Sequence, residues 1–352
     1  MAAFEDSPDD FARLFEERLS PALASLEPLG RRFSSFMRLF TRILVVLALT
    51  SAGILYLRSP GEKRWVIPPG VAIFLWFVVQ STFDRLWKRR FKREILSPAL
   101  AAIQNDMQYH PEGLVPKDTF QRSHLFPVRL DKYAGEDLVR GKVGATALEF
   151  CELQVQHCVK RWSLLKWIDK DAYVGIFRGF FFVADFNKHF LGTTLVLPEG
   201  NRALNDVLAR SLDRENRRQR QCVLLEDPEF ERLFSVHSDD QVEARYLLST
   251  SFMERLKEYR KHGDDTLAVS FSASKIFLAI FTRRDLFVPV TPHELSEIVE
   301  GGKARDALQR RLKQFLGDLD FWRELVEELH LNTRIWTRGA AEEDGPLPSV
   351  SA

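Results

Sequence analysis

The stretch "WVIPPGVAIFLWFVVQSTF", residues 65–83, carries no charged side chain over nineteen residues. A helix of this length spans about 28 Å, close to the roughly 30 Å hydrocarbon core of a bilayer. Pro68 and Pro69 indicate that the helix begins near them, because proline suits the first helical turn. We therefore predict a membrane-spanning helix within this stretch.

A second uncharged stretch comes before it. "ILVVLALTSAGILYL", residues 43–57, is fifteen residues long and would cover about 22 Å as a helix. Arg42 and Arg58 flank it and can extend the span, since their long stems reach toward the headgroups. Only seven residues, "RSPGEKR", separate the two stretches. We expect them to form a transmembrane hairpin within residues 36–93.

Basic residues are concentrated on the two outer flanks of this hairpin and are fewer in its turn. Lysine and arginine are retained on the cytoplasmic side of membranes, so both termini are expected to be cytoplasmic. This charge pattern argues against the alternative of two buried helices in a soluble domain. We expect no cleaved signal peptide, because the first apolar run starts too late and lacks a suitable basic leader.

The basic run that follows the second stretch has two interpretations. It can set the topology, or it can also bind anionic lipid headgroups, each charge contributing about 1 kcal/mol near the surface. The candidate headgroup ligands are Arg85, Lys88, Arg89, Arg90, Lys92 and Arg93.

The N-terminal residues 1–35 are expected to form an amphipathic arm. Ser7 can cap a helix and Pro8 suits its first position, while Pro21 is expected to end or kink it. The apolar face comprises Phe11, Leu14, Phe15 and Leu19. Because the polar face is acidic, we expect the arm to dock on the protein rather than on an anionic membrane.

Residues 94–338 are expected to form one cytoplasmic α+β domain, followed by a disordered tail over 339–352. Alternating polarity in "DLVRGKVGATALEFCELQVQHCVKRW" predicts a strand, a turn and a long strand. The other expected elements are strands around 172–186 and 192–199, a helix over 201–221, a strand, turn and strand over 222–238, a helix over 251–262 opened by a Ser251/Glu254 capping box, a hairpin of 266–271 with 275–281, a helix over 321–331, and a cap at Asp118.

A polar cluster stands out in "FSVHSDDQVEARYLL", residues 234–248. Ser238 and Gln241 have the spacing of a capping box, with acidic residues in the first turn of the helix that follows. The alternative is a metal or acid–base site that uses His237 with the acidic residues. The catalytic candidates are Asp239, Asp240 and Glu243. Asp239 and Glu243 are i,i+4 neighbours that could meet, whereas adjacent aspartates on a helix diverge by about 100°.

The net charge, the cysteines and the known motifs narrow the classes of function that the sequence allows. The chain has 352 residues, a net charge of +1 and three cysteines without a C-x-x-C spacing. The charge gives no reason to expect nucleic-acid binding, and the cysteines predict free thiols rather than disulfides or a zinc site. No dinucleotide, P-loop, zinc-protease or serine-hydrolase motif is present in the sequence. We expect no cofactor and no metal.

Several blocks in order resemble the bacterial DUF3137 family, over roughly residues 97–336. They are "GEDLVRGKVGATALEF", "FRGFFFVADFNKHFLGTTLVLP", "EDPEFERLFSVHSDDQVEARYLLS" and "LHLNTRIW". The resemblance implies a two-helix membrane hairpin followed by one soluble domain, and it implies no known reaction. A tyrosine is common in the family at the position of His237, which argues against a catalytic histidine. Genes for members of this family lie near genes for LemA-like membrane proteins, which suggests a role in envelope maintenance.

These observations predict a multi-pass protein of the bacterial inner membrane. Its cytoplasmic domain is expected to act as a binding or scaffolding module for a membrane-protein partner, with the lipid bilayer as its other partner. The sequence favours this over an enzyme. The alternative function is a membrane-tethered hydrolase that uses Asp239, Asp240 and Glu243.

Overall fold

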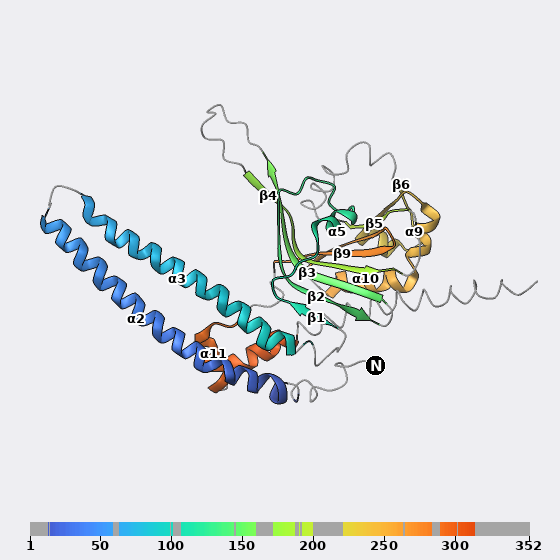
Figure 1. Ribbon diagram of the computed structural model, residues 1–352. Coiled ribbons are helices and arrows are strands. Elements are labelled where there is room, and N and C mark those ends of the chain that lie inside the picture. The colour runs from blue at the N-terminus through green and yellow to red at the C-terminus, as the bar shows by residue number, and fades with distance from the viewer. Residues whose placement is uncertain are drawn as a thin grey trace, which may run out of the picture. The chain divides into compact units, whose positions relative to one another are not determined.

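The structure is a computed structural model that separates into two compact units (Figure 1). The residues that it describes are 13, 15–58, 63–98, 100, 107–143, 146–159, 172–186, 190, 192–199, 221–262, 265–283, 289–300 and 302–313. One unit contains the described residues up to 100 together with those from 289 to 313. The other contains the described residues from 107 to 283.

The first unit is helical. Its elements are η1 (Phe15–Leu19), α2 (Ser20–Arg58), η2 (Lys63–Val66), α3 (Ile67–Phe91), η3 (Lys92–Leu96), α11 (Pro292–Glu300) and a helical run over 303–313. The helices α2 and α3 lie side by side as a hairpin (Figure 1). Their register is marked by Trp76 of α3, whose Nε1 donates a hydrogen bond to Thr41 Oγ1 of α2 at 3.2 Å.

Both expected apolar stretches lie within this hairpin, and α3 begins at its two prolines as predicted. The helical runs Ser20–Arg58 and Lys63–Leu96 are long and apolar enough to cross a membrane, by length and composition. Their exposed large apolar side chains between residues 36 and 78 form a surface that we call the apolar belt. Its members are Phe36, Leu39, Ile43, Val45, Val46, Leu47, Leu49, Ile54, Tyr56, Leu57, Trp65, Val66, Ile67, Val71, Ile73, Phe74, Leu75, Trp76, Phe77 and Val78.

The N-terminal arm is continuous with the first long helix. Phe15 and Leu19 are buried, as the expected apolar face requires, whereas Phe11 and Leu14 lie outside the described residues. Pro21 does not end the helix: it is the second residue of α2, where a π-helical turn passes into α-helix and its missing N–H is tolerated. The boundary expected at residue 35 therefore falls inside one 39-residue helix.

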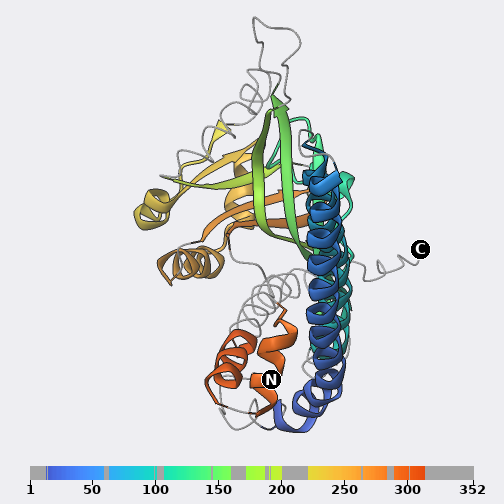
Figure 2. The same ribbon diagram turned by 90° about the vertical axis from the view of Figure 1, so that its left-hand side faces the viewer.

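The lower part of the hairpin packs against the C-terminal helices of the same unit. α11 lies against α2 (Figure 2), and the buried Trp87 donates a hydrogen bond from Nε1 to the carbonyl oxygen of Val290 at 2.7 Å. Gly30 permits this approach, because a Cβ there would lie 3.1 Å from the Trp87 ring. The packing thus groups residues 289–313 with the hairpin, whereas the single body expected over 94–338 would group them with the sheet.

The second unit is an antiparallel sheet with helices, which confirms the α+β class. Nine described strands have the order β1-β2-β3-β4-β9-β8-β5-β7-β6. The strands are β1 (Gln108–His110), β2 (Lys132–Val143), β3 (Thr146–Val159), β4 (Ala172–Asp185), β5 (Thr194–Pro198), β6 (Gln221–Cys222), β7 (Phe234–Ser238), β8 (Thr266–Ser272) and β9 (Lys275–Phe281). The helices are α5 (Lys117–Arg122), α8 (Pro228–Leu233), α9 (Gln241–Leu247) and α10 (Thr250–His262).

Local patterns predicted most of these strands. β2 pairs with β3, and β8 pairs with β9 about a turn in which Ala273 and Ser274 have φ values of 51° and 57°. The turn expected within 222–238 is instead the helix α8. Asp227 caps that helix by accepting hydrogen bonds from the backbone N–H groups of Glu229 and Phe230, which a turn assignment did not anticipate.

Aromatic side chains fill the core on one face of this sheet. Phe120 of α5 lies with its ring centroid 4.7 Å from that of Phe181, and Phe181 packs in turn on Phe277 of β9. Asp118 does not cap α5, whose N-cap residue is Pro116. The helices expected over 201–221 and 321–331 and the expected tail 339–352 lie outside the described residues.

Candidate functional site

The polar cluster of residues 237–243 lies where β7 passes into α9. Asp240, not Ser238, is the N-cap residue of α9: its Oδ1 accepts hydrogen bonds from Val242 N at 2.8 Å and Glu243 N at 3.0 Å. Ser238 ends β7 and is buried, and its hydroxyl is in hydrogen-bond contact with Thr194 Oγ1 at 2.9 Å. The predicted helix start is therefore correct, but the capping box is wrong by two residues, because the strand holds Ser238.

Asp239 and Glu243 come together, as their i,i+4 spacing suggested. Asp239 Oδ1 accepts a hydrogen bond from Thr193 N at 2.5 Å, and Glu243 Oε2 accepts one from Gly192 N at 3.1 Å. A Cβ on Gly192 would lie 2.5 Å from Glu243 Oε2 and 2.6 Å from Asp239 Oδ1, so a larger residue there would displace the two carboxylates. In this arrangement the two carboxylates hold the chain that leads into β5.

His237 is paired in the sheet between two neighbouring strands. It lies in β7, where its register partners are Leu195 of β5 and Cys222 of β6. Its half-buried side chain is on the opposite face from the buried Val236 and Ser238. The structure therefore brings together two of the acidic candidates on backbone N–H groups and uses the third as a cap.

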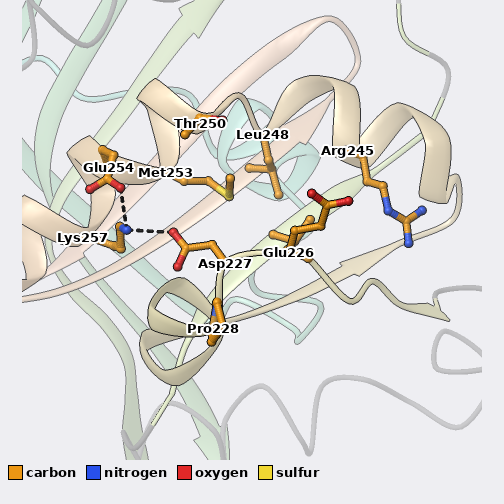
Figure 3. A pocket seen from close by; sticks show the side chains of 10 residues that line it. Glu226, Asp227, Pro228, Arg245, Leu248, Thr250, Met253, Glu254 and Lys257 are labelled. Atoms are coloured by element: carbon orange, nitrogen blue, oxygen red, sulfur yellow. Dashed lines mark hydrogen bonds and ion pairs between the residues drawn. The ribbon is translucent and has the colours of Figure 1, made fainter.

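An open pocket of about 600 Å³ lies between α8, α9 and α10 (Figure 3). The residues that line it are Leu225, Glu226, Asp227, Pro228, Arg245, Leu248, Thr250, Met253, Glu254 and Lys257. Leu248 and Met253 are buried and supply an apolar floor, whereas Glu226 and Glu254 are exposed at its rim. The pocket therefore combines apolar contact area with charge, which suits an amphipathic ligand.

Lys257 is the buried charge of this pocket. Its side chain is only 4% exposed, and Nζ lies 2.7 Å from Asp227 Oδ2 and 2.7 Å from Glu254 Oε1 (Figure 3). These hydrogen bonds raise the pKa of the Lys257 ammonium above its ordinary value. The pKa of the Asp227 carboxyl is lowered. The hydrogen bond from Lys257 is the largest cause, and the hydrogen bond from the Phe230 backbone N–H is the next. Lys257 is thus a neutralised cation that joins α10 to the start of α8.

The other end of the pocket is formed by α9. Glu226 and Arg245 lie at this end in Figure 3, away from Lys257. The Arg245 guanidinium donates hydrogen bonds to the carbonyl oxygens of Gln241 and Leu224, each at 3.3 Å. Leu224 is 71% exposed beside it, so the apolar surface continues beyond the pocket rim.

A second acidic cluster was missed by the sequence analysis. Carboxylate oxygens of Glu136, Asp137 and Glu152 lie within 4.8 Å of one another. Asp137 is 1% exposed, has a left-handed φ of 63°, and accepts a hydrogen bond from the Tyr109 hydroxyl. Burial, followed by the charge of Asp137, raises the pKa of Tyr109. Strand alternation alone would have put Glu136 and Asp137 on opposite faces, and a register shift between Glu136 and Val139 changes this.

The basic headgroup candidates lie at the C-terminal end of α3 and in η3. Five of them are exposed, and Arg90 forms an i,i+4 ion pair with Glu94 at 2.8 Å. Lys92 is 3% exposed and is therefore withdrawn from the surface. The cysteines Cys151, Cys158 and Cys222 are free, as predicted.

The fold and these sites define a class: an apolar two-helix hairpin joined to an antiparallel α+β domain that carries an open, partly charged pocket. Residues 175–331 match the model of the family described as "Protein of unknown function (DUF3137)". The match confirms the resemblance for this region, which contains the whole pocket and starts within β4. The earlier strands and the hairpin lie outside the matched region.

Two further comparisons add little. The crystal structure of the mycobacterial trehalose monomycolate transport factor A, TtfA, aligns with a TM-score of 0.30 and 12% identity, over 66% of this chain and 93% of that chain. This similarity is too low to support an inference about fold or function. The search of curated proteins gives no match.

Proposed function

We propose that the protein is an integral membrane protein whose sheet domain is a binding or scaffolding module. The observation that carries this proposal is the apolar belt. In the most apolar 18-residue segment of each helical run, only 6% (Ser20–Arg58) and 0% (Lys63–Leu96) of the residues are buried. The core helix of a soluble protein would be mostly buried. A contiguous apolar surface of this extent marks an interaction site, and a bilayer suits a hairpin of this length.

The flanking charges support one orientation. Arg85 and Lys88 are exposed at the base end of α3, and Arg32 is exposed on the matching part of α2. Since basic residues are retained in the cytoplasm, we propose that the base of the hairpin and the sheet domain lie on the cytoplasmic side of a bacterial inner membrane. Confinement beside the membrane raises the effective concentration of the domain for membrane partners.

The pocket is the proposed contact for a protein partner. Its apolar floor can accept one apolar side chain, and the exposed carboxylates of Glu226 and Glu254 favour basic flanking residues on the partner. We propose a basic segment of another membrane protein as the partner, in keeping with a scaffold of the cell envelope. The exposed basic candidates near the membrane would add attraction to anionic lipids.

The membrane anchor is tested by extraction of the full chain. Membranes that contain it are washed with alkaline carbonate, and the pellet is then floated on a density gradient with lipid vesicles. We expect the protein to stay in the pellet and to float. Release into the supernatant would contradict the anchor.

The binding role is tested by a photo-crosslinking amino acid at Thr250, on the pocket rim, in the full-length membrane protein. We expect a discrete adduct with a membrane protein that weakens about tenfold in Glu226→Lys, because the charge attraction is reversed. Glu199→Lys is the matched control, since Glu199 is exposed and does not line the pocket. Equal adducts in the two variants would contradict binding at the pocket.

The alternative is a hydrolase that uses Asp239, Asp240 and Glu243. It predicts a reaction that Asp239→Asn abolishes while the fold stays intact. The backbone N–H groups of Gly192 and Thr193 instead favour a structural effect, so the same variant should lower the melting temperature. Activity against a panel of ester and phosphoester substrates, measured beside the melting temperature, separates the two roles.

A further inference from the structure

Two arginines interrupt the apolar belt on α2. Arg38 and Arg42 are exposed, and they alternate with the apolar belt residues Phe36, Leu39 and Ile43, which are 53%, 58% and 49% exposed. The apolar surface thus continues past both arginines toward the base of the hairpin. A simple boundary between an apolar span and a basic flank would have placed them beyond its last apolar residue.

The register of the hairpin tells how deep these arginines lie. Trp76 is hydrogen-bonded to Thr41, so Arg42 is level with the middle of α3. The first charged residue of α3 toward the base is Asp84, eight residues after Trp76, which is about 12 Å along a helix. In a bilayer matched to α3, the backbone of Arg42 lies about 12 Å inside the boundary of the hydrocarbon core, and that of Arg38 about 6 Å inside it.

An arginine at this depth needs an anionic partner. Among the described residues, no carboxylate forms an ion pair with Arg38 or Arg42, and the Arg38 guanidinium donates only one long hydrogen bond, of 3.4 Å, to Ser35 Oγ. Arg31, seven residues before Arg38 on the same side of α2, differs because Glu27 and Glu300 pair with it. The protein therefore neutralises the arginine at the base and leaves the two in the apolar belt for another anion.

The spacing of the two arginines fits one phosphate group. Residues four apart lie about 6 Å from each other on one side of a helix, so both guanidinium groups can reach the same phosphate. Guanidinium groups bind phosphate through paired hydrogen bonds, and their long stems let them reach up toward the headgroup level. A lipid phosphate is the anion that the bilayer itself supplies at this place.

We propose that Arg38 and Arg42 form a binding site for the headgroup phosphate of an anionic phospholipid in the leaflet at the base of the hairpin. This inference rests on the proposed membrane anchor. A net negative lipid is preferred over a zwitterionic one, because two cationic side chains face one headgroup without a protein carboxylate to balance them.

The test uses the full chain in mild detergent, titrated with phosphatidylglycerol or phosphatidylcholine and followed by native mass spectrometry. We expect phosphatidylglycerol to bind the wild type at least about tenfold more tightly than phosphatidylcholine, and Arg38→Gln/Arg42→Gln to remove that preference. Arg38→Lys/Arg42→Lys keeps the charge but loses the paired hydrogen bonds, so it should retain only part of the preference.

The matched control is Arg310→Gln/Arg311→Gln. It removes the same charge from two exposed arginines of the helical run 303–313, outside the apolar belt, and should change phosphatidylglycerol binding by less than about twofold. Equal loss in the control and in Arg38→Gln/Arg42→Gln would overturn the proposal, as would equal binding of the two lipids by the wild type. If Arg38→Gln/Arg42→Gln fails to fold, the lysine variant and the single glutamine variants decide. The proposal is then overturned if Arg38→Lys/Arg42→Lys and each single glutamine variant keep the full preference for phosphatidylglycerol.

Failure of this inference can be told apart from failure of the anchor. Flotation of the wild type with vesicles of pure phosphatidylcholine after an alkaline wash reports on the anchor alone. A chain that floats but shows no preference for phosphatidylglycerol retains the anchor and lacks the site. A chain that does not float lacks both.

Discussion

At the scale of single residues, Gly179 shows how the sheet depends on a missing side chain. It has a φ of 145°, and a Cβ there would lie 1.9 Å from the carbonyl oxygen of Ile280 on the neighbouring strand. Gly179→Ala should therefore lower the free energy of unfolding by about 3 kcal/mol. The melting temperature of the detergent-solubilised full chain is the measurement. Gly175→Ala in the same strand is the control, because no atom of the described residues lies within 4 Å of its Cβ position, and equal effects would refute the argument.

The ion pair of Lys257 predicts how the stability of the protein depends on pH. Its bond lowers the pKa of Asp227, so the folded state resists protonation of that carboxyl more than the unfolded chain does. The resulting stability is present above the ordinary carboxyl pKa and is lost as pH falls through the lowered value. The pKa of Lys257 itself is raised, and its contribution is lost only at strongly alkaline pH.

Lys257→Met should therefore lower the melting temperature at pH 7 and flatten its decline below about pH 5. Melting temperatures of the full chain between pH 3 and pH 8 measure both effects. Lys261→Met is the control, because the Lys261 side chain is 52% exposed and pairs only with Glu229 among the described residues. A decline in Lys257→Met as steep as in the wild type would show that the ion pair does not control the acid limb.

At the scale of elements, two residues are candidates for the N-cap of α9. The structure assigns the cap to Asp240, whereas the sequence pattern predicted Ser238 with Gln241. Asp240→Ala should lower stability by about 1 kcal/mol, or roughly 2–4 °C for a domain of this size. Gln241→Ala should change it by less than about 0.5 kcal/mol, because among the described residues its side-chain amide bonds only the exposed Gln221. The reverse order in thermal melts would restore the predicted capping box.

At the scale of the whole molecule, the proposed topology predicts which thiols can be labelled and from which side. Cys222 is exposed, whereas Cys151 is buried and accepts a hydrogen bond from Val115 N. Burial raises the pKa of Cys151 to about 12, so its reactive thiolate is scarce at neutral pH. A membrane-impermeant maleimide should label the chain in inverted vesicles and not in intact cells, with most of the signal lost in Cys222→Ser. Labelling of intact cells would reverse the orientation.

By itself, the sequence determined the elements that depend on local pattern. The apolar stretches predicted α2 and α3, the two prolines marked the start of α3, and alternation predicted β3 and the β8–β9 hairpin, because period and turn chemistry are properties of neighbouring residues. It also indicated the DUF3137 resemblance, which the match over residues 175–331 confirmed.

Only the tertiary structure decided what distant residues do together. Lys257 and Asp227 are thirty positions apart, Asp239 and Thr193 are forty-six apart, and Trp87 and Val290 are 203 apart. No local pattern specifies these contacts, since each arises from strand order and helix packing that bring separate segments together. For the same reason the pocket and the assignment of α11 to the hairpin unit appear only in the folded chain, and the carboxylates of the polar cluster are seen there to bind backbone N–H groups.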